Sequence, residues 1–212
     1  MFQKKDIQLC LLDCGGVVYP YSLDYFYAQV SKYNLKEDSL HFKWKELMLG
    51  KISVSDFNKD VCSLCGVCYD SQKEAELNFS LLKGVGKIYP QTRELIAYLK
   101  GKNLKIGLLS NALPQLECTI GELCLDKEFI FPSYHLKDLK PNASIFKKVQ
   151  ERTQIPFHKM LFIDDKSENV EVALSFGIKS LVYNPKTVLN DIKRIVGEKN
   201  VRCSCNRRCN CR

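Results

Sequence analysis

Gln8-Leu9-Cys10-Leu11-Leu12-Asp13-Cys14-Gly15-Gly16-Val17-Val18-Tyr19 is the stretch of this 212-residue chain that decides its fold. Its apolar run has the length of a strand and ends at an aspartate, which two glycines follow closely. A continuous apolar run is typical of a strand that is buried on both faces of a parallel sheet. Asp13 is then expected at the carboxyl end of the strand, where open α/β sheets bind ligands, with Gly15 and Gly16 allowing close approach of the backbone. Taken alone, Asp13 is equally well explained as a turn or helix-cap residue.

Four later segments repeat the pattern of a short apolar run that ends in polar residues: 104–109, 129–131, 160–163 and 180–183. Helical patterns lie between or beside them, at 91–101, 113–125, 143–153 and 169–176. Strands that alternate with helices predict a parallel sheet covered by helices on both sides. The expected fold class is therefore α/β, a doubly wound Rossmann-like sheet.

Residues 21–85 interrupt this alternation, because they contain several helical patterns and no convincing strand. Ser53 with Asp56 has the form of a helix start. We expect a helical cap at 21–85 that stands over the carboxyl end of the sheet, and an α/β core made of 1–20 and 86–199. The Cys/Arg-rich tail at 200–212 is expected to be disordered.

Composition places the chain among globular proteins, with 45% hydrophobic and 26% charged residues. No apolar stretch is long enough to span a bilayer, and the N-terminal residues lack the features of a signal peptide, so a cytoplasmic protein is expected. The formal net charge is +8, but the basic residues are scattered among acidic ones. The pattern indicates neither a nucleic-acid partner nor a membrane partner.

The eleven cysteines are more consistent with reduced core residues, metal ligands or redox groups than with a disulfide framework. Cys62, Cys65 and Cys68 have CxxCxxC spacing, but no fourth ligand is near them in the sequence. The tail contains four cysteines that can form a zinc site or belong to a disordered basic segment: Cys203, Cys205, Cys209 and Cys211.

Polar residues follow the expected strands in a fixed order, namely Asp13, Ser110-Asn111, Lys140-Pro141 and Asp164-Asp165 with Asn169. Together with the helical insert and its Gly50-Lys-Ile52-Ser53 phrase, this set resembles the haloacid dehalogenase-like hydrolase superfamily. The resemblance covers residues 7 to about 183 and points to the phosphatase branch with an α-helical cap. That branch includes bacterial glucose-1-phosphate phosphatase-type members.

The resemblance implies a magnesium-dependent phosphatase that acts on a small phosphorylated metabolite such as a sugar phosphate. Asp13 would be the nucleophile and would form an aspartyl-phosphate. Cys14, Gly15, Ser110 and the Asn111 amide would bind the phosphoryl group, and Lys140 would pair with both that group and Asp13. Magnesium would take oxygen ligands from Asp13, the Gly15 carbonyl and Asp165, with Asp164 in an outer-shell or water-mediated position and Asn169 orienting the cluster.

Gly15 departs from the phosphatase pattern, which has a second aspartate two residues after the nucleophile as the general acid and base. Three outcomes remain open. The leaving group is acidic enough to depart without full protonation, as in a sugar-1-phosphate; another residue or water supplies the proton; or the chain binds phosphate ligands without turnover. General acid–base groups typically contribute ~10²–10⁴-fold, so the difference is large.

Three other functions remain as alternatives to the phosphatase. A catalytically weak binding or regulatory protein on the same fold is favoured by Gly15, and a 2-haloacid dehalogenase is favoured by Ser110-Asn111-Ala-Leu-Pro114-Gln115. Asp164 and Asp165 argue against the dehalogenase, which needs no metal. A metal-handling role would depend on the cysteine tail. Substrate specificity is expected from residues of the cap region near Asp13: Tyr19, Tyr21, Asp24 and Tyr25.

Overall fold

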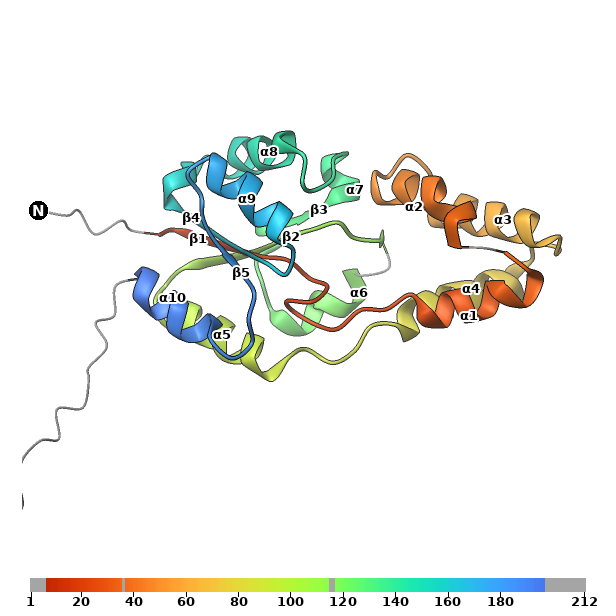
Figure 1. Ribbon diagram of the computed structural model, residues 1–212, viewed down its shortest axis with the longest axis horizontal. Coiled ribbons are helices and arrows are strands. Elements are labelled where there is room, and N and C mark those ends of the chain that lie inside the picture. The colour runs from red at the N-terminus through yellow and green to blue at the C-terminus, as the bar shows by residue number, and fades with distance from the viewer. Residues whose placement is uncertain (1–6, 36, 115–116, 197–212) are drawn as a thin grey trace, which may run out of the picture.

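The computed structural model describes residues 7–35, 37–114 and 117–196, and it contains the expected parallel sheet (Figure 1). The strands are β1 (Leu9–Leu12), β2 (Lys105–Ser110), β3 (Ile130–Pro132), β4 (Met160–Asp164) and β5 (Lys179–Val182). They lie in the order β3-β2-β1-β4-β5, and every neighbouring pair is parallel. The order reverses around the central strand β1, so the loop after β1 lies at the topological switch point where such sheets bind ligands.

Helices cover both faces of the sheet, as Figure 1 shows. α8 (Ala143–Thr153) and α9 (Ser167–Ser175) lie on one face, and α5 (Pro90–Gly101) and α10 (Val188–Val196) lie on the other. Leu9 and Leu11 pack into the core on the first face, while Cys10 and Leu12 pack into the core on the second. Because all four side chains are fully buried, β1 reads in the sequence as one uninterrupted apolar run.

Four helices form a separate group beyond the carboxyl ends of the strands: α1 (Asp24–Val30), α2 (His41–Met48), α3 (Val54–Cys65) and α4 (Ser71–Lys83). We call residues 24–83 the helical insert. Its interior is aromatic. The ring centroid of Trp44 lies 4.4 Å from that of Phe57 and 5.0 Å from that of Phe26. Ser53 and Asp56 form the expected capping box at the start of α3.

Two connections join the helical insert to the sheet, and they run side by side. The Ser22 amide donates to the Gly84 carbonyl at 3.0 Å, and the Gly86 amide donates to the Pro20 carbonyl at 2.9 Å. A Cβ atom at Gly84 would lie 1.7 Å from the Ser22 carbonyl oxygen, a distance that no real side chain permits. Glycine is therefore required at this position, because the two connecting segments of the chain approach each other so closely.

The sequence predicted the strands more accurately than the helices between them. In place of one helix at 113–125 the structure has the short α6 (Glu117–Ile120) and a 3₁₀ turn (Gly121–Leu123), a break that fits the low helix propensity of Gly121. α7 (Ser133–Leu136) and α10 were not predicted. The remaining 3₁₀ turns are Ser31–Tyr33, Glu37–Leu40, Lys127–Phe129 and Phe157–Lys159.

Several sequence-based expectations concern cysteines and surface properties. The four tail cysteines of the zinc hypothesis lie outside the described residues. Cys62 is buried and Cys68 exposed, and the only cluster of three potential metal ligands in the described ranges does not include them.

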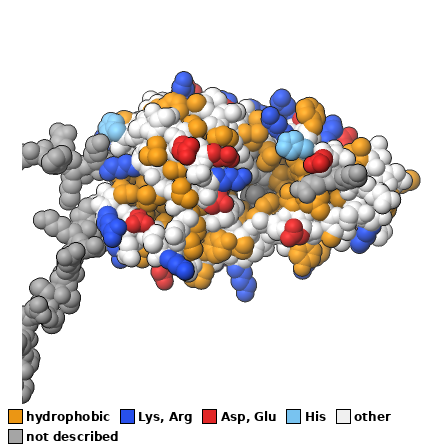
Figure 2. Space-filling view, in the orientation of Figure 1, with side chains coloured by type: hydrophobic (Ala, Val, Ile, Leu, Met, Phe, Trp, Pro, Cys, Tyr) orange, Lys and Arg blue, Asp and Glu red, His pale blue; other side chains and the backbone are white. Residues whose placement is uncertain are grey.

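Within those ranges no helix combines the length and apolar character that crossing a membrane requires. Lys and Arg side chains are interleaved with Asp and Glu over the face drawn in Figure 2.

Candidate active site

The carboxyl ends of three adjacent strands bring the predicted polar residues together. Leu12 at the end of β1 lies beside Leu108 of β2 and Ile163 of β4 in the parallel register. Asp13, which follows Leu12, donates its backbone amide to the Ile163 carbonyl at 2.9 Å and so lies at the same level as Asp164. The parallel register therefore brings residues that are far apart in the sequence together at the carboxyl ends of these strands.

Lys140 lies between two of these carboxylates. Its Nζ is 2.9 Å from Asp13 Oδ1 and also donates to Asp164 Oδ2, and its side chain is 2% exposed. Burial alone would lower the pKa of Lys140, but the Asp13 and Asp164 carboxylates outweigh burial and the pKa is raised. Lys140 is therefore held as a buried ammonium ion that orients the Asp13 carboxylate.

The position of Lys140 is fixed through its own backbone. Asn111 Nδ2 donates to the Lys140 carbonyl, and the Lys140 amide donates to Asn111 Oδ1, both at 2.8 Å. Both polar atoms of the Asn111 side chain are therefore occupied by the Lys140 backbone. The backbone amide of Asn111 is the group predicted to donate to a phosphoryl oxygen. Asp138 supports the same loop from below, accepting from the Leu139 amide and from Asn142 Nδ2 at 2.9 Å each.

Asp164 and Asp165 are adjacent in sequence but have different surroundings. Asp164 is fully buried, and its Oδ1 accepts from the Lys166 amide and Asn169 Nδ2, both at 2.9 Å. Asp165 lines the cavity, and its pKa is raised by burial first and by Asp13 and Asp164 next. Asn169, for which the family resemblance implies an orienting role, thus contacts Asp164.

Oxygen atoms of Asp13, Asp164 and Asp165 lie within 4.8 Å of one another, and a cation is the group that such a set accommodates. Two observations fit magnesium at this place. The pKa of Asp165 is raised by burial first and then by repulsion from Asp13 and Asp164, and a dication relieves that repulsion. Asn169 Oδ1 is buried without a hydrogen-bond partner among the described residues, and such an amide oxygen suits a hard cation.

The loop after Asp13 closes tightly over the sheet edge. Val18 donates its amide to the Cys14 carbonyl at 2.8 Å, and the Gly16 amide donates to the Tyr19 carbonyl at 2.9 Å. Gly16 has a φ of +78°, and a Cβ there would lie 2.4 Å from Asp165 Oδ2. The glycine is needed both for the left-handed backbone and for the space that Asp165 occupies.

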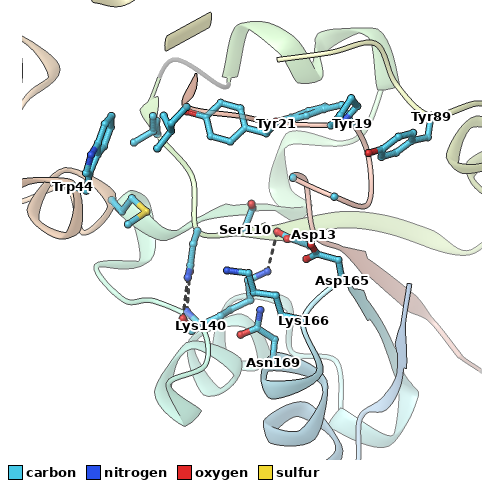
Figure 3. A pocket seen from close by; sticks show the side chains of 17 residues that line it. Asp13, Tyr19, Tyr21, Trp44, Tyr89, Ser110, Lys140, Asp165, Lys166 and Asn169 are labelled. Carbon is cyan, nitrogen blue, oxygen red and sulfur yellow. Dashed lines mark hydrogen bonds and ion pairs between the residues drawn. The ribbon is translucent and has the colours of Figure 1, made fainter. Parts of the chain in front are cut away.

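These residues form the floor of a cavity of ≈ 560 Å³ between the sheet edge and the helical insert. Figure 3 shows Asp13, Lys140, Asp165, Lys166 and Asn169 on one side, and Tyr19, Tyr21 and Tyr89 along the opposite side. Trp44 reaches the cavity from α2 of the insert. A small ester placed here would meet charged groups at one end and aromatic rings at the other.

Some predicted site residues contact the cavity and others do not. Asp13, Gly15, Ser110, Asn111, Lys140, Asp165 and Asn169 line it, as do Tyr19 and Tyr21 among the predicted specificity residues. Asp24 and Tyr25 are exposed on α1 and are absent from the cavity lining. The Cys14 thiol is buried instead in the core, where burial raises its pKa to about 12, so any contact to substrate would come from its backbone.

Several residues that line the cavity were missed by sequence reasoning, among them Trp44, Met48, Tyr89 and Lys166. Lys166 had a usable signal, because it follows Asp165 directly. The other three come from the insert or from the connection after it, and their spacing indicates only ordinary helix packing. Their place in the wall depends on how the insert rests on the core.

Comparison with known proteins identifies the family. Residues 7–177 match the haloacid dehalogenase-like hydrolase family, and the chain belongs to it. A solved magnesium complex of a family enzyme from Bacteroides thetaiotaomicron has a TM-score of 0.76 at 21% identity, covering 89% of this chain and 98% of that one. A predicted family hydrolase from Porphyromonas gingivalis has a TM-score of 0.75 at 19% identity, covering 91% of this chain and 99% of that one. At these identities the two structures support the fold alone.

Curated relatives add chemical context. A D-ribitol-5-phosphate phosphatase from Bacteroides thetaiotaomicron is 26% identical over 195 residues, covering 82% of this chain and 90% of its own length. A phosphorylated carbohydrates phosphatase from Thermotoga maritima is 31% identical over half of each chain. The match to acyl-CoA dehydrogenase family member 10 of mouse covers 73% of this chain at 26% identity but only 15% of that protein.

Proposed function

We propose that this chain is a magnesium-dependent phosphatase that hydrolyses a small phosphorylated metabolite through an aspartyl-phosphate. The observation that carries the proposal is the Asp13 carboxylate, which is held by buried Lys140 at the floor of the cavity and lies beside Asp165. The two phosphatase relatives support it, since both act on phosphorylated compounds according to their names. The helical insert would act as the cap that closes over the substrate.

Asp13, whose carboxylate is oriented by Lys140, would attack phosphorus as the ester P–O bond breaks. The leaving oxygen would take the electron pair of that bond and depart as an alkoxide or phenoxide that water protonates. Phosphoryl transfer develops charge on three equatorial oxygens, so catalysis depends on positioned donors and cations. The Ser110 hydroxyl and the Asn111 amide lie at the end of β2, where they would donate to those oxygens. Water would then hydrolyse the acyl phosphate and free Asp13 for the next turnover.

Magnesium would be held by Asp13, Asp165 and the Gly15 carbonyl, with Asp164 outside this set. Both Asp164 oxygens already accept hydrogen bonds from Lys140, Lys166 and Asn169, whereas Asp165 faces the cavity. This division supports the ranking of the two aspartates made from the sequence. When bound, the ion supplies positive charge to the phosphoryl oxygens and lowers repulsion between substrate and Asp13.

The second candidate is a phosphate-binding protein with little turnover, and the absence of an acidic side chain at Gly15 favours it. The dehalogenase alternative is disfavoured by the carboxylates of Asp164 and Asp165, which would repel a carboxylate substrate. A 2-haloacid dehalogenase from Pseudomonas syringae pv. Tomato has a TM-score of 0.58 at 17% identity, which speaks only to shared fold.

Turnover of 4-nitrophenyl phosphate tests the proposal, because its leaving group departs without a general acid. We expect hydrolysis with magnesium, loss of hydrolysis in excess chelator, and a loss of at least about 10³-fold in Asp13→Asn, whose amide is not a nucleophile. Glu168→Gln, which removes an exposed carboxylate from the nearby helix α9, is the matched control and should retain full activity. Activity of Asp13→Asn within a few-fold of the wild type would contradict the assignment of the nucleophile.

A further inference from the structure

The charged residues of the cavity all lie at one end. Among the residues that line it, the only charged ones are Asp13, Lys140, Asp165 and Lys166, and Figure 3 shows them together at the floor. We define the upper chamber as the part of the cavity lined by Tyr21, Leu23, Trp44, Met48, Tyr89 and Leu113. These side chains are aromatic or aliphatic, and none carries a charge at neutral pH.

The upper chamber offers few polar groups, and no charged side chain is among its lining residues. Trp44 Nε1 donates to the Tyr27 hydroxyl at 2.9 Å, so Trp44 offers the cavity only its ring. The Met48 carbonyl accepts from the Ser133 hydroxyl at 2.7 Å. The Tyr21 hydroxyl oxygen is buried, and burial raises the pKa of Tyr21, so the phenol stays neutral. A charged group placed in the chamber would lose hydration and meet no opposite charge there, only the hydroxyls of Tyr21 and Tyr89.

We infer that the substrate is a phosphate monoester whose remaining part is uncharged and presents an apolar face, such as a sugar or aryl ring. This inference rests on the proposed function and adds the class of leaving group to it. Aromatic rings bind the apolar faces of flat or ring-shaped groups through dispersion and desolvation. Bisphosphates and phosphorylated carboxylic acids are excluded by the same reasoning, because their second charge would face the rings of the chamber.

The test compares two esters that differ in one charge. 4-Carbamoylphenyl phosphate is neutral at the position where 4-carboxyphenyl phosphate carries a carboxylate, and the two are nearly equal in size. The kcat/KM values are measured at one ionic strength. They are compared with a plot of log kcat/KM against leaving-group pKa for uncharged aryl phosphates, and the line through that plot corrects for leaving-group acidity. We expect the carboxylate ester to fall at least about tenfold below that line while the amide lies on it. A carboxylate ester on or above the line would overturn the inference.

A charge introduced into the chamber supplies the complementary test. Met48→Lys places an ammonium ion in the chamber, and Phe42→Lys places the same charge on the same helix at a side chain that is 66% exposed and outside the cavity. Met48→Lys should raise the carboxylate-to-amide ratio of kcat/KM about tenfold, and Phe42→Lys should leave it unchanged. Equal ratios in the two variants would overturn the placement of the leaving group.

Failure of the proposed function is separable from failure of this inference. If no aryl phosphate is hydrolysed with magnesium, the phosphatase proposal fails, and calorimetric binding of the two esters still decides the inference. Weaker binding of the carboxylate ester supports the upper chamber as a neutral site, and equal or tighter binding overturns it. Hydrolysis with preference for the carboxylate ester would overturn the inference and leave the phosphatase proposal standing.

Discussion

The backbone at Gly15 leaves room for the side chain that is missing there. Gly15 is not among the glycines with positive φ, and a Cβ at this position would meet Tyr21 Cβ at an ordinary 3.7 Å. Neither strain nor a clash at Cβ explains the glycine. The loss of an acidic side chain is thus a chemical feature of the site, and it can be reversed by substitution.

Leaving-group acidity should control the rate of the wild-type protein. A plot of log kcat/KM against leaving-group pKa is expected to fall steeply for aryl, glycosyl and alkyl phosphates, because unassisted departure leaves charge on oxygen. Gly15→Asp should flatten the slope and accelerate alkyl phosphates at least about tenfold, within the ~10²–10⁴-fold typical of a general acid. Gly15→Asn is the isosteric control and should keep the slope. A slope near zero in the wild type, with chemistry rate-limiting, would mean that another group donates the proton.

Asp165 should destabilise the metal-free protein at neutral pH. Its pKa is raised in the folded state by burial, Asp13 and Asp164, so the folded state binds a proton more readily than the unfolded one. Stability is then lost as pH rises from the ordinary carboxyl pKa of 3.8 through the raised value. Asp165→Asn should raise the Tm at pH 7 in chelator by about 1–3 °C, a small value because Asp165 is partly exposed.

The gain in Asp165→Asn should fade as pH falls below about 4, and magnesium should reverse its sign because the metal stabilises only the wild type. Glu168→Gln removes an exposed charge nearby and should show neither effect. Differential scanning calorimetry at several pH values measures both. A destabilised Asp165→Asn in chelator at pH 7 would contradict the repulsion among the three carboxylates.

At the scale of single elements, the turn after β1 offers a comparison between two left-handed glycines. Gly16 has a φ of +78° and Gly177, after α9, has a φ of +77°, so alanine strains both backbones similarly by about 1 kcal/mol. Only at Gly16 would the new Cβ meet Asp165, whereas nothing lies within 4 Å at Gly177. Gly16→Ala should lose activity at least about 10²-fold and require more magnesium, while Gly177→Ala should lose stability alone. Equal kinetic effects would show that Asp165 does not depend on this turn.

The strands were predictable because each carries a local signal, a buried apolar run with a polar residue at its end. Asp13 carries this signal, whereas the roles of Lys140 and Asn169 came from the family resemblance. In the structure Lys140 contacts Asp13, and Asn169 contacts Asp164. The reciprocal bonds between Asn111 and Lys140 could not be predicted, because they join two loops through backbone atoms. α10 was missed although Val188 and Ile192 are spaced one turn apart and buried.

At the scale of the whole molecule, two contacts attach the helical insert to the core near the end of α2. The Ser133 hydroxyl of α7 donates to the Met48 carbonyl and accepts from the Ala112 amide at 3.1 Å, and Lys137 Nζ donates to the Gly50 carbonyl at 2.6 Å. α2 carries Trp44 and Met48 into the cavity wall. These contacts therefore determine how one wall of the cavity faces the floor.

Removing these contacts should affect substrate binding more than chemistry. Ser133→Ala leaves two buried backbone groups unpaired, at a cost of about 1–3 kcal/mol or about 2–8 °C in Tm. Lys137→Met keeps the length of the side chain but removes the donor, and it should raise KM several-fold with little change in kcat. Ser175→Ala, which removes a hydroxyl bonded only within α9, is the control. A fall in kcat with unchanged KM would indicate that these contacts act on the floor of the site instead.

The paired connections at Pro20–Ser22 and Gly84–Gly86 bear on how such a protein evolves. The chain departs from the sheet and returns to it at adjacent points, and the described residues of the helical insert contribute no strand to it. A different helical segment joined at the same two points would leave Asp13, Lys140 and Asp165 in place and replace Trp44 and Met48, the part of the cavity wall that the insert supplies. Selection can thus change substrate recognition by the insert without changing the residues that carry out the reaction. The boundary between the two parts is the short stretch where the outgoing and returning segments of the chain lie side by side.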